Sequence, residues 1–217
     1  MPRGTDSKQA QRPVNGRSAQ KRRAILDASR EVFLNNGYLS ASMDQVAALA
    51  DVSKVTVYKH FSDKPSLFIA AVTDAIEEAE ATSRSLVDHL GQSVDLEADL
   101  RTFARRHIMV VTQPHLIRMR RMIIAEATRF PELANTWHQA GPARAHAKLA
   151  AQIEQLTGRG LLQAADPLLA AQHLNYLILS VPVNEAMFTG RDQPYNRRQL
   201  RRYADEAIRV FMAGYGR

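Results

Sequence analysis

Hydroxyl, phenol and ammonium groups gather in one short segment of the chain, residues 53–60. Ser53 is suited to cap a helix, and that helix would place Val57 and Phe61 on one side at i,i+4 spacing. Its other side carries Lys54, Thr56, Tyr58 and Lys59. A short helix with an apolar back and a basic, hydroxylated front suits the DNA major groove, where a helix can read base edges.

The remaining side chains do not form the patterns that catalysis or metal binding needs. The chain has no cysteine, which excludes disulfides and thiolate chemistry. No glycine-rich phosphate loop and no G-x-S-x-G motif occurs. The histidines considered as metal ligands do not pair at helical spacing; they are His107, His115, His138, His146 and His173. The sequence therefore predicts no enzyme, no cofactor and no metal site.

Helices on both sides must position the 53–60 segment. An amphipathic helix is predicted over 17–37, ended by Gly37 with a positive φ. A second runs from Met43 to about residue 50, and a fourth starts at about residue 64. The turn before Ser53 contains Asp51, a residue type that tolerates a positive φ better than most.

The combined string F-x₃-G-Y-x₃-S-M-x₂-V-A-x₂-A-x-V-S-K-x-T-V-Y-K-H-F-x₂-K-x₂-L-F resembles the N-terminal domain of the TetR family of bacterial transcription regulators, over residues 18–70. Two positions depart from the usual family pattern: Asp51 replaces a glycine, and Val55 replaces a glycine or small residue. The segment from Arg120 to Leu133 is similar to the C-terminal domain of an AefR-like branch, over about residues 100–215.

This resemblance implies roles for individual residues. The group expected to face base edges or thymine methyls is Ser53, Lys54, Val55, Thr56 and Tyr58. The group expected to hold phosphates is Ser42, Lys59, His60 and Lys64. The charge distribution agrees with a nucleic-acid partner: residues 1–61 hold ten Lys and Arg against five Asp and Glu, within a chain of net charge +7.

The ends and the apolar runs bear on location. Residues 1–16 lack periodicity and are predicted to be a disordered basic arm, which either contacts DNA or is only a solvated tail. No signal peptide is visible, and the longest uncharged stretch, 168–184, is too short and polar for a membrane span. We therefore expect a cytoplasmic protein with no membrane contact.

Beyond residue 64 the pattern is helical throughout, with breaks at glycine and proline. The predicted class is all-α with about nine helices. It comprises a three-helix helix-turn-helix domain over 17–63 and a helical bundle for ligand binding and dimerisation over 64–217. The expected helices of the bundle are 64–89, 95–112, 115–129, 131–157 with a bend near Gly141, 166–189 and 196–213.

The last two helices are the predicted dimer interface. Residues 166–189 are apolar nearly all round, so this helix needs cover on every side. The last helix carries an apolar stripe predicted to lie in the same interface: Leu200, Tyr203, Ala204, Ala207, Ile208 and Phe211. The resemblance implies a homodimer through these helices; the alternative is a central helix buried within one monomer.

A ligand cavity is expected where Pro182 interrupts its helix, because a bend opens space between helices. We expect a volume of roughly 300–1,000 Å³. Aromatic, methionine and polar side chains are predicted to line it: Phe103, His107, Met119, Met122, Ile123, Trp137, His173, Asn175, Tyr176 and Met187. For each of these residues, ordinary core packing is the competing interpretation.

The predicted function is a DNA-binding transcription regulator, a homodimeric repressor that a small molecule releases from operator DNA. Two alternatives stay open. One is an activator or constitutive DNA binder of the same fold with no effector. The other is a helical enzyme, for which no polar catalytic cluster is visible.

Overall fold

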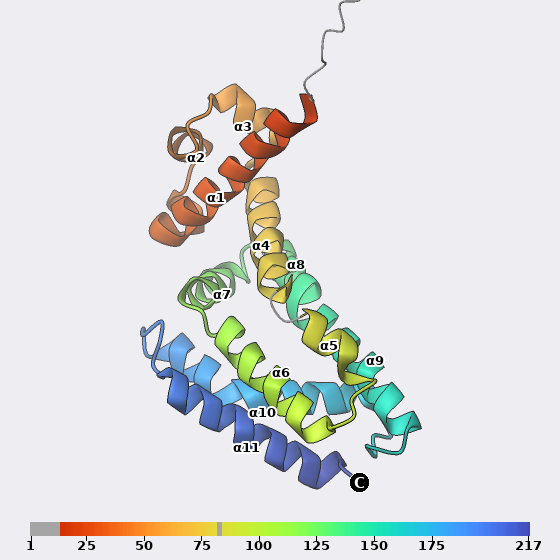
Figure 1. The fold of residues 1–217 in the computed structure, drawn as a ribbon. Coiled ribbons are helices and arrows are strands. Elements are labelled where there is room, and N and C mark those ends of the chain that lie inside the picture. Colours follow the sequence, from red (N-terminus) through yellow and green to blue (C-terminus); the bar gives the residue numbers. More distant parts are fainter. Residues whose placement is uncertain (1–13, 82–83) are drawn as a thin grey trace, which may run out of the picture.

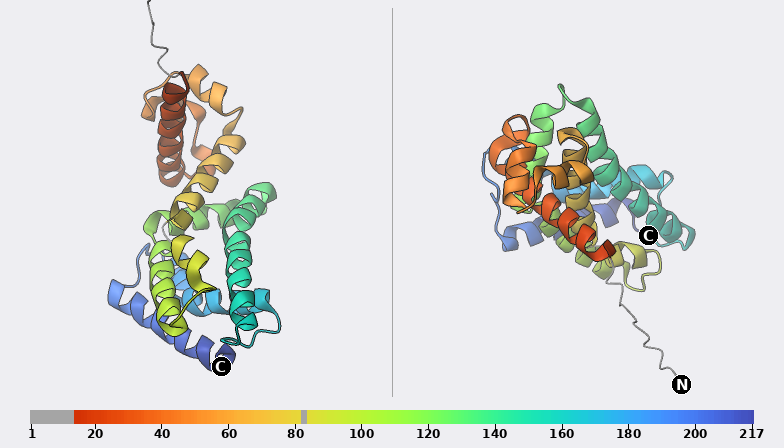
Figure 2. Two further views of the ribbon diagram at one scale, coloured as in Figure 1. Left: turned by 45° about the vertical axis from the view of Figure 1, so that its right-hand side comes forward. Right: turned by 90° about the horizontal axis from the view of Figure 1, so that it is seen from above.

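The computed structural model describes residues 14–81 and 84–217, which form a small helical head on a larger helical body (Figures 1 and 2). The head contains α1 (Val14–Ser40), α2 (Met43–Leu49) and α3 (Lys54–His60). The predicted all-α class is confirmed. The remaining elements are α4 (Lys64–Ala81), α5 (Arg84–Leu90), α6 (Leu96–Val111), α7 (Pro114–Glu126), α8 (Pro131–His138), a π-helical turn (Gln139–Ala143), α9 (Arg144–Gly158), α10 (Pro167–Phe188) and α11 (Arg197–Tyr215).

Several predicted boundaries shift. The expected arm over 1–16 lies outside the described residues except for its last three, which already belong to α1. The expected helix 64–89 is described as α4 and α5, on either side of residues 82–83. The predicted bend near Gly141 is a full π-helical turn that contains Pro142. Proline supplies no N–H to the helical ladder, so the local hydrogen bonds change register.

The turns of the head adopt the predicted backbone. Gly37 has a φ of +75° and breaks the regular helix of α1. Asp51 has a φ of +51° and is the one non-glycine residue with a positive φ in the described chain. The tight turn between α2 and α3 therefore forms with an aspartate at a position where glycine is usual.

Helix α4 joins the head to the body (Figure 1). The buried apolar residues form two cores: one comprises the head, α4, α7 and α8, and the other lies among α5, α6, α9, α10 and α11. The head core contains an aromatic cluster in which Phe33 and Tyr38 each lie with ring centroids 4.9 Å from that of Phe68. This core continues into α7 and α8 of the body, where Met119 and Ile123 are buried against it. The head therefore rests on α7 and α8 as well as on α4.

The apolar stripe of α11 lies in the monomer rather than on its surface. Leu200, Ala204, Ala207, Ile208 and Phe211 are all buried, and α11 packs on α6 and α10. The prediction that this stripe forms the dimer face is therefore wrong, because the body needs it to close its own core. No helix in the described ranges is long and apolar enough to cross a membrane.

Candidate DNA-binding face and effector pocket

The two short helices of the head begin at side-chain caps. Ser42 accepts a hydrogen bond from the Gln45 backbone N–H, and the Gln45 side chain accepts one from the Ser42 backbone N–H. Ser53 accepts from the Thr56 backbone N–H in the same way, and the two hydroxyls lie 2.8 Å apart. These caps satisfy backbone donors that a seven-residue helix leaves unpaired.

The outer face of α3 is apolar and aromatic as well as basic. Val57 is completely buried, whereas 78% of Val55 and 45% of Tyr58 are exposed. Lys59 is exposed beside them, and His60 is partly exposed. Apolar groups such as Val55 and Tyr58 are unfavourable in contact with water. A partner that covers them, such as a DNA groove with thymine methyl groups, would therefore be bound favourably.

Lys54 is already paired in the free protein. Its Nζ lies 2.8 Å from the Asp44 carboxylate on α2, and both side chains are exposed. This pair is weak in water, so it can open when a stronger anion approaches. Arg22 on α1 lies over the ring of Phe61, with its guanidinium carbon 5.4 Å from the ring centroid. No local pattern in the sequence singles out this cation, because its proximity to the end of α3 is a tertiary contact.

Lys64 has a different environment from the one expected for a phosphate contact. Its ammonium donates to the backbone carbonyls of Tyr38, Leu39 and Ala41 at 2.9, 3.0 and 3.1 Å. It also lies 4.8 Å from the centroid of the Tyr38 ring. An ammonium has three N–H donors, and all three are used. We therefore correct its role: Lys64 ties the end of α1 to the start of α4.

This role predicts a loss of stability rather than of DNA contacts. Lys64→Met should lower the free energy of unfolding by about 2 kcal/mol, because three carbonyls lose charge-assisted hydrogen bonds. Lys54→Met is the matched control and should change it by less than about 1 kcal/mol. Urea unfolding followed by circular dichroism measures both. Equal effects of the two substitutions would contradict the assignment.

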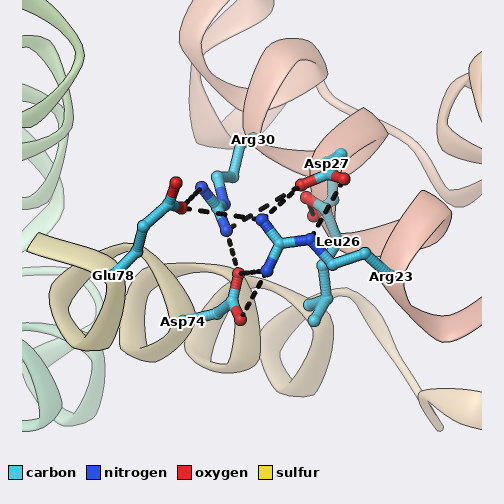
Figure 3. A network of polar contacts seen from close by, with 7 residues as sticks. Arg23, Leu26, Asp27, Arg30, Asp74 and Glu78 are labelled. Carbon is cyan, nitrogen blue, oxygen red and sulfur yellow. Dashed lines mark hydrogen bonds and ion pairs between the residues drawn. The ribbon is translucent and has the colours of Figure 1, made fainter. Parts of the chain in front are cut away.

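An ion-pair network joins α1 to α4 (Figure 3). Arg23 and Arg30 come from α1, and Asp74 and Glu78 come from α4. Arg30 donates to Glu78 at 2.7 Å and also to Asp74, while Arg23 contacts Asp74 at 3.1 Å. Only 15% of the Arg30 side chain is exposed, compared with 49% for Arg23. Movement of α4 should therefore carry α1 with it.

A cavity of about 160 Å³ lies in the body between the end of α4, α5, α6, α7, α8 with the π-helical turn, α9 and α10. Most of its lining is aliphatic or aromatic. The polar or charged side chains that reach it are Glu80, Asp88, His107, Arg120, Trp137, His146, Lys148 and Asn175. Its apolar lining includes Ile76, Val110, Leu116, Leu149 and Leu179.

The structure brings together only part of the predicted lining. Phe103, His107, Trp137 and Asn175 line the cavity. The others do not: Met119, Met122 and Ile123 pack against the head core, and Met187 packs in the body core. On α10, Nδ1 of His173 lies 2.6 Å from the Tyr215 hydroxyl, and Tyr176 is 57% exposed. Spacing on a helix identified apolar positions but not the core to which each belongs.

Pro182 does not create the cavity. It lies inside α10, buried, and lines a separate hollow between α6 and residues 193–201. The cavity instead lies beside the π-helical turn, where Gly141 and Pro142 form part of the wall. Trp137 and His146 would face opposite sides of a straight α-helix, and the π turn between them allows both to reach the cavity. The cavity is also smaller than expected.

Burial disfavours the charged form of the cavity histidines. It lowers the pKa of His107 and of His146, with the hydrogen bond to Asn175 acting against this effect at His107. Nε2 of His107 donates to Oδ1 of Asn175 at 3.0 Å. Glu80 is held by Arg144 at 3.3 Å and by Lys148 at 3.0 Å.

Unlike Glu80 and Lys148, Arg120 lines the cavity without an ion-pair partner among the described residues. Burial lowers its pKa, but a guanidinium stays protonated in proteins. Its guanidinium carbon lies 5.9 Å from the Trp137 ring centroid. Within residues 14–81 and 84–217, no carboxylate or carbonyl accepts a hydrogen bond from it. Its neighbours Arg118 and Arg121 instead face Asp192.

Comparisons with known proteins identify both parts of the chain. The family model for bacterial regulatory proteins of the tetR family matches residues 25–71, and that for the AefR-like transcriptional repressor C-terminal domain matches residues 98–217. A crystal structure of a TetR-family transcriptional regulator from Mesorhizobium loti is 40% identical, with a TM-score of 0.87 over 93% of this chain and 99% of that one.

Curated relatives match over shorter lengths. The HTH-type transcriptional activator FasR of Mycolicibacterium smegmatis is 43% identical over 24% of each chain. The HTH-type transcriptional regulator UidR of Escherichia coli K12 is 31% identical over 52% of this chain and 55% of its own length. These relatives are DNA-binding regulators rather than enzymes. The chain belongs to the TetR family of transcription regulators.

Proposed function

We propose that this protein is a repressor that binds operator DNA as a homodimer and releases it when a small molecule occupies the cavity beside the π-helical turn. The observation that carries the proposal is the course of α4. Its first part contributes Leu67 and Phe68 to the head core, and its last part contributes Ile76 and Glu80 to the cavity wall. One rigid helix therefore touches both sites.

The coupling follows from packing. A ligand that requires a wider cavity would displace the end of α4, and the Arg30 ion pairs would transfer that displacement to α1 and the head. Such a ligand binds one arrangement of the heads better than the other and shifts the population between them. A protein that acts on operator DNA in this way would be cytoplasmic.

We place the DNA contacts on the outer face of α3. Ser53, Val55, Thr56 and Tyr58 would face base edges, with Lys54 joining them once its pair with Asp44 opens. Ser42, Lys59 and His60 would hold phosphates. Two observations support this placement. These side chains are exposed or partly exposed in the free protein, and the head carries an excess of basic residues.

Two substitutions on this face should separate base reading from phosphate binding. Tyr58→Ala should lower operator affinity by roughly 1–3 kcal/mol and relax the preference at one base position. Lys59→Met should weaken binding to all sequences alike and reduce the salt slope by about one. Arg101→Met, on α6 and paired with Glu97, is the control and should change neither.

Fluorescence anisotropy with duplexes from the protein's own promoter region, over a range of salt concentrations, measures both quantities. Absence of salt-dependent binding to any of these duplexes would reject the DNA-binding assignment of α3. The same base preference in Tyr58→Ala and the unchanged protein would reject Tyr58 as a reader of bases.

The homodimer is proposed from the outer side of α10. Apolar side chains remain exposed along this helix, and they are Leu168, Leu169, Tyr176, Leu177, Val181 and Phe188. A second copy of the chain, related by a two-fold axis, would cover the same stripe on both subunits. The stripe replaces the α11 residues as the expected interface, with Val210 of α11 exposed beside it as a contributor.

A further inference from the structure

We propose that the cavity binds a small aromatic carboxylate, with the carboxylate on Arg120 and the ring against the apolar wall. This inference rests on the proposed ligand response, because it names the chemical class of the effector. It goes beyond that response in stating which charge the pocket recognises.

The first observation is a cation without a counter-ion. The other cations near the cavity and α7 have carboxylate partners: Arg144 and Lys148 contact Glu80, and Arg121 contacts Asp192 at 2.9 Å. Arg120 lines the cavity, and nothing in the described ranges neutralises it. A guanidinium held away from bulk water is costly unless an anion completes its hydrogen bonds. A planar carboxylate fits its fork of donors.

The second observation is a polar atom without a partner in the same cavity. Nε2 of His146 is buried and makes no hydrogen bond to any described residue. His146, Arg120 and His107 all line this cavity. A neutral imidazole can donate one hydrogen bond. A ligand oxygen held by Arg120 would thus have a second donor available from His146.

The third observation is the size of the space. A protein cavity of about 150 Å³ accommodates one benzene molecule, and this cavity measures about 160 Å³. Phe103, Leu149 and Leu179 provide an apolar wall. One aromatic ring with a carboxylate therefore matches the volume.

Benzoate and benzamide provide a direct test, because they have nearly the same shape and differ in charge. Isothermal titration calorimetry of the full chain should show benzoate binding at least tenfold more tightly than benzamide. Arg120→Met should lose that tenfold preference and retain its weak affinity for benzamide. Arg118→Met, on the other side of α7, should bind both like the unchanged protein. No benzoate binding at millimolar concentration, or equal binding of the two compounds, would overturn the inference.

Thermal unfolding without ligand excludes a purely structural role. If Arg120 exists to bind an anion, Arg120→Met should melt at the same or a higher temperature, because an unpaired cation is replaced by an apolar side chain. A lower melting temperature with the benzoate preference intact would show that Arg120 serves packing on Trp137, and would overturn the inference.

Operator release, measured separately by anisotropy, distinguishes this inference from the proposed function. Benzoate that binds through Arg120 but leaves the operator complex intact supports the carboxylate pocket and overturns ligand-induced release. Release by neutral aromatic compounds, but not by benzoate, supports the induced release and overturns the carboxylate pocket.

Discussion

Val181→Asp is expected to convert the protein from a dimer to a monomer and to lower operator affinity by about a hundredfold or more. Half of the Val181 side chain is exposed in the single subunit, so an aspartate there keeps its hydration and leaves the subunit folded. In the proposed dimer it would be buried without a counter-ion on both sides of the two-fold axis, which costs several kcal/mol. Separated subunits lose the advantage of two linked DNA-binding heads.

Sedimentation equilibrium and operator anisotropy measure the two effects. Val94→Asp is the matched control, because Val94 is fully exposed before α6 and away from α10. It should change neither the mass nor the affinity. Ile208→Asp should instead unfold the subunit, since that residue is completely buried in its core. A monomeric unchanged protein at micromolar concentration would contradict the α10 interface.

Arg30→Met is expected to lower the free energy of unfolding by about 2–3 kcal/mol, because its loss leaves Asp74 and Glu78 as neighbouring carboxylates with only Arg23 between them. Arg23→Met belongs to the same network but is half exposed. It should cost less than about 1 kcal/mol. Chemical denaturation of the unchanged protein, Arg30→Met and Arg23→Met at neutral pH measures the difference. Equal losses of unfolding free energy in the two variants would contradict the expectation that the more buried arginine contributes more.

The same network predicts an acid dependence. The hydrogen bond from Arg30 lowers the pKa of Glu78 below its ordinary value, although burial acts in the other direction. A carboxylate with a lowered pKa in the folded state contributes stability above its unfolded pKa, near pH 4, and loses it as the pH falls through the folded value. Stability of the unchanged protein should therefore fall more steeply than that of Arg30→Met on acidification below about pH 5. The same dependence of stability on pH in both proteins would contradict the link between Arg30 and the pKa of Glu78.

The local features of the head follow directly from its sequence. Ser53 was expected to cap α3 because it precedes an apolar helical repeat, and it accepts the expected backbone N–H. Ser42 caps α2 in the same way. Asp51 takes a positive φ, a conformation that aspartate tolerates better than most residues. Val57 had to face inward because it shares a helix side with Phe61, and both are buried. These features depend on neighbours within a few residues.

The sites of the body depended on contacts between distant segments. The apolar stripe on α11 was predicted correctly. Only the packing of α6 and α10 against it decides that the stripe is buried within one subunit. Met119 and Arg120 are adjacent on α7, yet one enters the head core and the other faces the cavity. Lys64 is basic at a position expected to hold phosphate, but its ammonium donates to two carbonyls at the end of α1 and to that of Ala41, just after it.

The sequence by itself therefore determined the class of the fold, the helix-turn-helix head and the family, because helical periodicity, caps and turns are local properties. Tertiary structure alone decided where the cavity lies, which cation faces it and which side of α10 remains uncovered. The physical reason is that a helical pattern states which face is apolar but not what covers it. Burial, and with it the strength of each charge interaction, is set by residues far away in the chain.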